Sequence, residues 1–547
     1  MNGRGALSAA FAALLCIASA CTRVGTGPSS GGEHAWTRHG VLRIVNLGEP
    51  DTLNPLIGNQ QIDNDLSMLW GGYFFNVDDR NAFVPELAAF VPTLANGGIS
   101  RDGRTVVYHL RRGVLWQDGK PFTAADVVFT WHAIMSPQNN IPSRVGYDLI
   151  GAIDVRDPYT IAVHLRRPYA PFVGTFFAMS GDPYPVLPAH LLAGLPSLNQ
   201  ASYNAQPLGT GPFIVERWQR GQKIIFRANP RYWRGRPRLD RIEYTAIADE
   251  STLLTQMQSH EADLWFNAPS PDYPTLQRIR DLEIRLTPFT AFSQIALNLA
   301  HPPLGDVRIR HALGYATNAD RLLATVTHGV HIRGDSDQPA FSWAHANGLP
   351  RYDYDPARAR ALLEAAGWRA GPDGIRIKNG ARLSLVASSQ TGSATANAVE
   401  VALQRDWRDV GVDLAIKNYV TSLFFASYGA GGIAQTGKFD AGFFAWYNGV
   451  DPDDSTQFMC DQTPPNGQNL YHLCDPSLDA AERVAVTNND PATRKRAYDT
   501  IQRRLAEDEP FILLWFVRRI DVWNPDLRNF RPAHAVTDFW NSWEWQI

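Results

Sequence analysis

The sequence predicts a mixed α/β protein (mixed α+β) that is divided into two or three domains. The chain has 547 residues, whereas a single hydrophobic core usually stops growing near ~250–300 residues. Runs with the two-residue periodicity of half-buried strands are interspersed with helices that begin at capping signals. The two kinds of element alternate irregularly and no internal repeat is present, which favours mixed structure over a helical bundle, a solenoid or a pure β-sandwich.

The first segment of the chain is typical of an export signal. Arg4 supplies a short positive region, and the apolar stretch at residues 6–20 is shorter than the roughly 20 apolar residues that a membrane span requires. We therefore expect residues 1–20 to be a signal peptide that is removed from the mature protein.

Cys21 follows directly after this segment. The residues before it, Ile-Ala-Ser-Ala, permit ordinary cleavage after an Ala-x-Ala site and also resemble a lipobox, with Ala18 where lipoboxes most often carry leucine. We favour the lipoprotein, in which Cys21 carries a lipid that anchors the protein to the membrane. Residues 21–40 begin with a stretch rich in Gly, Ser and Thr, so they are expected to form a flexible tether.

The rest of the chain is expected to lie beyond the membrane, in the periplasm or at the cell surface, because no later segment offers about 18 uninterrupted apolar residues. Cys460 and Cys474 are then the cysteines of the mature body, and in an oxidising compartment they are expected to form a disulfide. Closing such a loop stabilises a fold by about 3 kcal/mol in the chain-entropy model. Two unrelated thiols are the alternative, and a zinc site has only His472 as a further nearby ligand.

Two strands are predicted in the first third of the body. Residues 106–110 and 161–165 alternate in the pattern of half-buried strands, and turns that begin at Asp102 and Asp157 precede them.

Three helices are predicted from their first residues. Thr123 and Asp126 approximate a capping box, while Asp355 and Asp490 each precede a proline at the first helical position. The helix that begins at Asp490 carries its apolar residues on one face, so it is expected at a domain surface.

Composition and motifs exclude several classes of function. With 44% hydrophobic and 19% charged residues and a net charge of -3, the chain has no basic excess that would suggest nucleic acid. The 16 Trp, 18 Tyr and 26 Phe residues fit either an apolar binding chamber or ordinary core packing. Residues 432–439 approach a phosphate-binding loop, but Phe439 replaces the Ser or Thr that would hold magnesium. Zinc-protease and nucleophile-elbow motifs are also missing, so we expect no catalytic residue, metal or cofactor.

A series of ordered motifs points to a known family. The longest is LRRGVLWQDGKPFTAADVVFTW at residues 110–131. It is followed by PLGTGPF at 207–213, NPRYW at 229–233, LNLAHPPLGDVRIRHAL at 297–313, a DP-x-x-A-x-x-LL-x-x-AG pattern at 355–367, FDAGFFAWYNGVDPDD at 439–454 and EDEPFILLWF at 507–516. Together they resemble the family-5 extracytoplasmic solute-binding proteins, the group of oligopeptide, dipeptide and nickel binders.

The resemblance implies a periplasmic-binding-protein-like body of two lobes with an extra inserted domain. Lobe I would be discontinuous, domain II would be inserted into it, and lobe III would close over the ligand by hinge motion. The implied boundaries are 41–80, 206–290 and 511–547 for lobe I, 81–205 for domain II and 291–510 for lobe III.

The resemblance also implies ligand-binding residues after the FDAGFFAW strand, namely Trp446, Tyr447, Asn448 and Asp451. In peptide-binding relatives an Asp a few residues past the tryptophan neutralises the ammonium group of the ligand. Here the first carboxylate is Asp451, so either Asp451 reaches the ammonium after a loop shift or Asn448 accepts from a ligand without a free amine. Phe443 stands where some relatives carry a ligand-binding arginine.

A second set of ligand-binding residues is expected on the strand that enters lobe III. Phe292, Gln294 and Asn298 are spaced to point the same way, toward the cleft.

The implied function is that of the extracytoplasmic substrate-binding component of an ABC importer. It would capture short peptides between two hinged lobes and deliver them to the permease subunits, acting as a monomer. The alternatives are a non-peptide solute (an opine, an oligosaccharide, a haem-like group or a nickel chelate), a secreted enzyme, or a receptor that presents its ligand to a signalling partner.

Overall fold

The computed structural model of the chain describes residues 33–58, 60–180, 183–534 and 537–547. The predicted signal peptide at 1–20, Cys21 and the first part of the predicted tether therefore lie outside the described residues. Over the ranges that are described, every helix is too short or too polar to cross a membrane.

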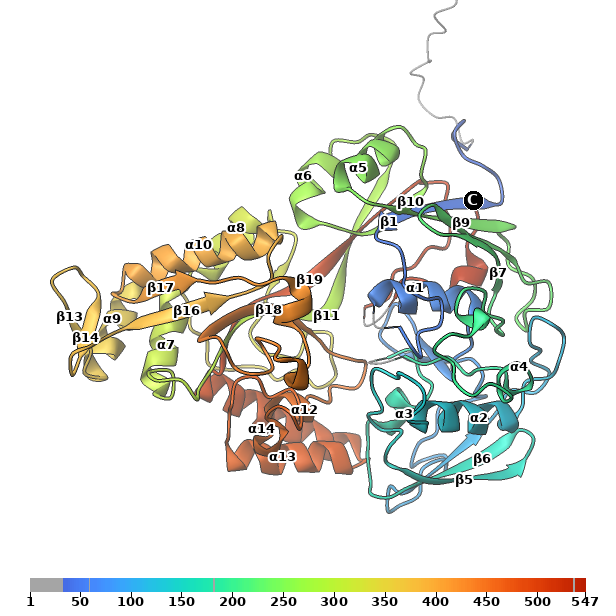
Figure 1. Cartoon of the computed structure of the whole chain (residues 1–547), viewed down its shortest axis with the longest axis horizontal. Coiled ribbons are helices and arrows are strands. Elements are labelled where there is room, and N and C mark those ends of the chain that lie inside the picture. The colour runs from blue at the N-terminus through green and yellow to red at the C-terminus, as the bar shows by residue number, and fades with distance from the viewer. Residues whose placement is uncertain (1–32, 59, 181–182, 535–536) are drawn as a thin grey trace, which may run out of the picture.

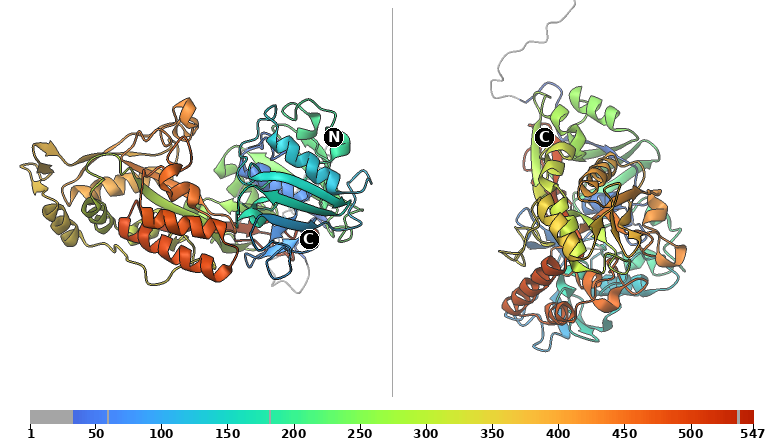
Figure 2. Two further views of the ribbon diagram at one scale, coloured as in Figure 1. Left: turned by 90° about the horizontal axis from the view of Figure 1, so that it is seen from below. Right: turned by 90° about the vertical axis from the view of Figure 1, so that its left-hand side faces the viewer.

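One large mixed sheet runs through the molecule and joins two bodies that lie side by side (Figures 1 and 2). Its long strands β11 (Glu283–Leu297) and β19 (Phe511–Trp523) pair antiparallel. At one end β19 pairs with β10 (Leu264–Ala268), and at the other end β11 pairs with β18 (Ala441–Tyr447). The same two strands therefore belong to both bodies.

The first body contains the N-terminal part of the large sheet together with two smaller sheets. Its strands in the large sheet are β10, β1 (Val41–Leu47), β9 (Arg241–Ile247), β8 (Lys223–Ala228) and β7 (Phe213–Gln219). Smaller sheets pair β2 (Phe75–Val77) with β3 (Phe83–Pro85), and β4 (Thr105–His109) with β6 (Thr160–Leu165) and β5 (Ile150–Asp157). The helices are α1 (Gln61–Trp70), α2 (Ala124–Met135), α3 (Phe172–Thr175), α4 (Ala189–Leu192), α5 (Glu250–Gln258) and α6 (Tyr273–Leu276).

One hydrophobic core fills most of the first body. It joins Leu42 of β1 and Trp70 of α1 to Tyr108 of β4 and Phe176 beside α3. Segments that the sequence assigned to lobe I and to domain II therefore share a single core.

The second body has helices on both faces of the sheet (Figure 1). Ile295 of β11 points into a core shared with the α7–α10 side, and Phe292 points into a core shared with α13 and α14. The strands here are β18, β16 (Ser384–Ser388), β17 (Asp413–Ile416) and β12 (Ile332–Arg333), with a hairpin layer of β13 (Arg369–Ala370), β14 (Arg376–Lys378) and β15 (Ala381–Arg382). The helices are α7 (Val307–Ala316), α8 (Ala319–Val326), α9 (Pro356–Ala365), α10 (Ala394–Arg408), α11 (Thr421–Phe424), α12 (Ser455–Phe458), α13 (Pro476–Thr487) and α14 (Pro491–Asp508).

The predicted local elements are confirmed. The two predicted strands coincide with β4 and β6 within a residue. Thr123 and Asp126 form the capping box of α2, and the carboxylates of Asp355 and Asp490 accept hydrogen bonds from backbone amides in the first turns of α9 and α14.

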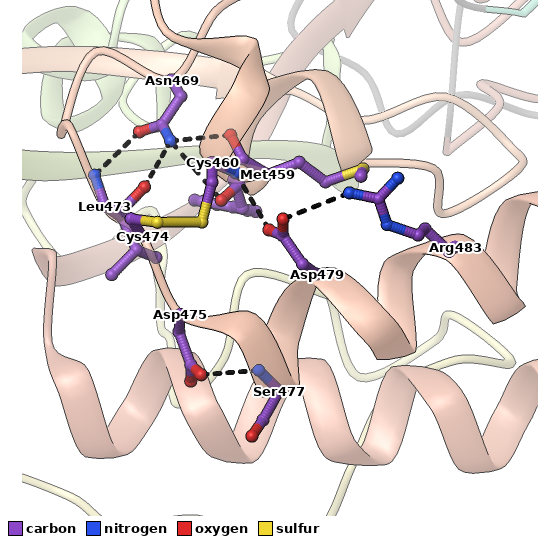
Figure 3. Close-up of a disulfide and its surroundings, with 10 residues drawn as sticks. Met459, Cys460, Asn469, Leu473, Cys474, Asp475, Ser477, Asp479 and Arg483 are labelled. Atoms are coloured by element: carbon purple, nitrogen blue, oxygen red, sulfur yellow. Dashed lines mark hydrogen bonds and ion pairs between the residues drawn. A yellow bond between two sulfur atoms is a disulfide. The ribbon is translucent and has the colours of Figure 1, made fainter.

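The structure also contains the disulfide expected between Cys460 and Cys474 (Figure 3). The backbone N–H of Cys460 donates to Asp479 at the start of α13, 2.9 Å away. Asn469, fully buried, donates to the carbonyls of Met459 and Leu473, so the loop is fixed by hydrogen bonds as well.

Candidate functional site

The two bodies join where the pairing of β11 and β19 is irregular, and we call this place the hinge. The register shifts between Pro288 and Phe292, in the middle of β11. Proline cannot donate to a β-ladder, so the two strands are held less firmly here than on either side. Such a break in two otherwise continuous strands is suited to bending of one body against the other.

A second contact between the bodies is made by residues 448–454, which we call the bridge segment. The backbone N–H of Val450 donates to Ser180 Oγ at 2.9 Å. The Tyr169 hydroxyl donates to Asp453 Oδ2 at 2.9 Å. The α13–α14 pair lies beside the α3 region (Figure 1), and the N–H of Ala170 donates to the carbonyl of Val486 at 2.7 Å. The bodies are therefore joined at the hinge and again at the bridge segment.

Asp451 of the bridge segment is already paired within the second body. Its two carboxylate oxygens accept from Nη1 and Nη2 of Arg494 at 2.7 and 2.6 Å, a bidentate ion pair. Arg494 is 7% exposed, so the pair is largely removed from water. A ligand ammonium would have to compete with this guanidinium for Asp451, at the cost of leaving a buried charge without its partner.

The other predicted residues at the end of β18 differ sharply in exposure. Asn448 is buried, and its Nδ2 donates to the carbonyl of Asp337 at 2.8 Å. Trp446 is half-buried and donates from Nε1 to the Tyr471 hydroxyl at 2.8 Å. Tyr447 is 61% exposed. Of this group, Tyr447 presents the most open surface to a solute.

The Tyr447 ring lies next to the hinge. Its centroid is 5.8 Å from that of Phe289, in an edge-on arrangement. The guanidinium of Arg519 covers Phe289 at 4.5 Å and also forms an ion pair with the buried Asp538. Aromatic and cationic side chains from β18, β11 and β19 thus meet where the bodies join.

The second set of predicted ligand-binding residues, on and after β11, is buried. Phe292 and Gln294 are 0% exposed, and Asn298 is 1% exposed. Gln294 exchanges hydrogen bonds with the Tyr471 hydroxyl, and Asn298 donates to the carbonyls of Gly437 and Phe439. Phe292 and Gln294 share a face of β11, as the alternation predicted. That face lies toward the α13–α14 side of the second body rather than toward open solvent, because the same core contains residues of those helices.

A cluster of buried carboxyl groups lies at the end of the bridge segment and includes its last residue, Asp454. Asp337, Asp454 and Glu482 are each at most 2% exposed. The Gln338 side-chain amide donates to Asp337 Oδ2 at 2.8 Å and to Asp454 Oδ2 at 3.3 Å, and to the carbonyl of Pro452 at 3.3 Å. Burial raises the pKa of all three carboxyl groups, and their mutual repulsion adds to the effect for Asp454 and Glu482. Sequence reasoning missed this cluster because its members are far apart in the chain and follow no spacing rule.

In the ranges that the structure describes, no three His, Cys, Asp or Glu side chains are placed to hold a metal ion.

Comparison with known proteins agrees with this architecture. Residues 89–468, more than half of the chain, match the family described as bacterial extracellular solute-binding proteins, family 5. The chain is 25% identical to the oligopeptide-binding protein AppA of Bacillus subtilis over 542 residues, 98% of this chain and 97% of AppA.

Two solved structures show the same fold. NikZ from Campylobacter jejuni, solved in complex with Ni(L-His), matches with a TM-score of 0.79 and 25% identity over 93% of this chain and all of NikZ. Bacillus subtilis AppA in complex with a nonapeptide matches with a TM-score of 0.76 and 23% identity, over 92% of this chain and 98% of AppA. The predicted fold class, the predicted family and the expectation of a non-enzymatic binding protein are confirmed. The chain belongs to the family-5 bacterial extracellular solute-binding proteins.

Proposed function

We propose that this chain is the substrate-binding component of an ABC importer and that it captures short peptides between its two bodies. The observation that carries the proposal is the passage of two continuous strands from one body to the other, with a register break at Pro288, in a chain of this family. Bodies connected in this way close over a ligand by hinge bending. The similarity to AppA, an oligopeptide-binding protein, supports a peptide as the ligand.

Tyr447 is the residue that we propose to contact the ligand first. It is exposed, it stands beside the hinge residue Phe289, and a tyrosine ring offers a broad apolar face with a polar tip. Trp446 and Asn448 would hold the end of β18 in place through Tyr471 and Asp337. The backbone at the end of β18 can pair with an extended peptide, which gives affinity without demanding particular side chains.

Phe292, Gln294 and Asn298 would act on the ligand indirectly. Their side chains are buried, so we propose that they fix the position of β11 and of the loop near Gly437.

A non-peptide solute is the second candidate, and the Asp451–Arg494 ion pair favours it. Because Asp451 is engaged at 2.6 and 2.7 Å, it offers no free carboxylate to a peptide ammonium. NikZ, 25% identical to this chain, was solved with Ni(L-His), so a metal chelate is the alternative ligand to test.

We further propose that Cys21 carries a lipid that anchors the protein outside the membrane, and that the closed form delivers its ligand to permease subunits as a monomer. Metabolic acyl labelling of wild type against Cys21→Ser tests the anchor. Equal labelling of the two proteins would contradict it.

Native mass spectrometry tests the ligand class. The protein is purified without its first 20 residues, and any small molecule released on denaturation is identified. A mixture of short peptides, lost from the Tyr447→Ala variant but retained by the matched variant Tyr428→Ala, supports the peptide proposal. A single metal chelate or sugar would replace it with the second candidate, and retention of peptides by Tyr447→Ala would remove Tyr447 from the site.

A further inference from the structure

The second body contains a cavity that is separate from the region around Tyr447. It has a volume of about 70 Å³ and is lined by residues 333–337, residues 350–352, the end of α14 and the start of β19. One water molecule occupies about 10–15 Å³ by this measure, so the cavity has room for roughly five waters or for a molecule of similar size. Arg351 and Asp335, both on the surface, stand at its edge.

Two polar atoms of the cavity lining are buried without a hydrogen-bond partner among the described residues. They are Arg333 Nε and Glu509 Oε2. Arg333 uses Nη1 to bond the carbonyls of Leu513 and Leu514, while its Nε lies 3.7 Å from the Asp320 carboxylate, beyond hydrogen-bonding distance. Buried polar groups are nearly always paired in folded proteins, so the unpaired Glu509 Oε2 at the wall of a cavity indicates a polar partner at this place.

The backbone at Glu509 points to the same conclusion. Glu509 is 4% exposed and has φ 42°, in the left-handed region, where it ends α14. Glycine is the residue that normally takes this position, and another residue there costs about 1–3 kcal/mol. The strain holds a carboxyl group at the cavity wall, next to Gly314, whose missing side chain leaves the space for it.

The lining is chemically two-sided. Arg333 can donate to an anionic group, while Glu509 can accept from a cationic one. Burial raises the pKa of Glu509 well above its ordinary value, against the opposing effect of Arg310 and Arg333. Leu505, Phe511 and Leu513 form the apolar remainder of the wall.

We propose that this cavity is a second ligand site that binds a small zwitterion of amino-acid size, with its carboxylate at Arg333 and its ammonium at Glu509. Tyr447, the centre of the proposed solute site, does not line this cavity. Its wall is connected to the bridge segment, because the carbonyl of Asp337 accepts from Asn448. A zwitterion bound in the cavity would therefore affect the position of the end of β18 through this hydrogen bond.

Isothermal titration of the purified chain with glycine tests the proposal. Acetate and methylammonium serve as probes that each carry one of the two charges. We expect saturable binding of one glycine, at least tenfold weaker binding of either single-charge probe, and a loss of at least tenfold in affinity in Glu509→Gln. The matched variant Glu507→Gln changes an exposed residue on the same helix and should bind glycine like wild type. Tyr447→Ala should also leave glycine binding unchanged.

Several outcomes would overturn the proposal. Absence of saturable binding at millimolar glycine would show a cavity filled with water only. Equal affinity in Glu509→Gln would place the glycine elsewhere, and loss of binding in Tyr447→Ala would place it at the solute site. If Glu509→Gln does not fold, a crystal structure of the wild type grown with glycine decides the question, since ordered water alone in the cavity contradicts the proposal.

Discussion

Removal of the Tyr169 hydroxyl should shift the protein toward its open form. In the structure this hydroxyl donates to Asp453 Oδ2 at 2.9 Å, across the two bodies, and Tyr169 lies beside the backbone bond from Ala170 to Val486. When the bodies separate, both groups can bond to water, so the net contribution is that of an ordinary protein hydrogen bond, about 0.5–1.5 kcal/mol. Since each 1.4 kcal/mol is about a factor of ten, Tyr169→Phe should lower the closing constant roughly two- to tenfold.

Double electron–electron resonance measures this shift directly. Spin labels on Val155 of β5 and Val401 of α10, 52% and 61% exposed, report the distance between the bodies. Tyr108→Phe is the matched control, because the Tyr108 hydroxyl is buried in the first body and has no partner among the described residues. The distance distribution should move toward longer values in Tyr169→Phe and stay as in wild type in Tyr108→Phe. Identical distributions in the two variants would refute a role of this bond in closure.

Three further predictions concern stability. Asp451→Asn leaves the Arg494 guanidinium buried without its carboxylate and should lower the free energy of unfolding by about 3–5 kcal/mol; an unchanged urea midpoint would contradict this. Reduction of the Cys460–Cys474 disulfide, which spans 14 positions, should cost about 3 kcal/mol, and Cys460→Ser should reproduce the loss in a thermal melt. Burial raises the pKa of Glu482, so the folded state binds this proton more tightly than the unfolded state does. The contribution of Glu482 to stability is therefore complete below the ordinary pKa of a glutamate, near 4, and it declines as the pH rises toward the pKa of the folded state. Glu482→Gln should flatten this decline in thermal stability, and an equal slope in wild type and variant would exclude Glu482 as its source.

The parts of the fold that could be predicted from the sequence are those that depend on neighbouring residues. The capping box at Thr123 and the aspartate caps at Asp355 and Asp490 are satisfied within one helical turn, so their spacing is enough to place the helix start. The alternation on β11 predicts that Phe292, Gln294 and Asn298 point the same way toward the cleft, whereas β11 ends at Leu297 and Phe292 lies in a core. Alternation carries no information about what covers that face, and here it belongs to the core shared with α13 and α14.

Most of the candidate site depends instead on contacts between distant segments. Asp451 and Arg494 are 43 positions apart, and Tyr169 and Asp453 are 284 apart. No periodicity links such pairs, so the sequence could name Asp451 as a charged residue near the ligand but could not show that its charge is already neutralised.

The side chains from Trp446 to Asp454 lead to an expectation about ligand choice. From Trp446 to Asp454 the polar side chains are already used: Asn448 binds Asp337, Asp451 binds Arg494 and Asp453 binds Tyr169, while Tyr447 remains 61% exposed. A solute at this end of β18 therefore meets an aromatic ring and backbone groups rather than a charged side chain of the segment. Backbone hydrogen bonds give affinity for any extended ligand, whereas pockets shaped for particular side chains are needed to distinguish one ligand from another. A site of this kind therefore accepts ligands with different side chains. We expect the protein to release a mixture of related ligands rather than one compound, and substitutions at Asp451 to change stability more than ligand choice.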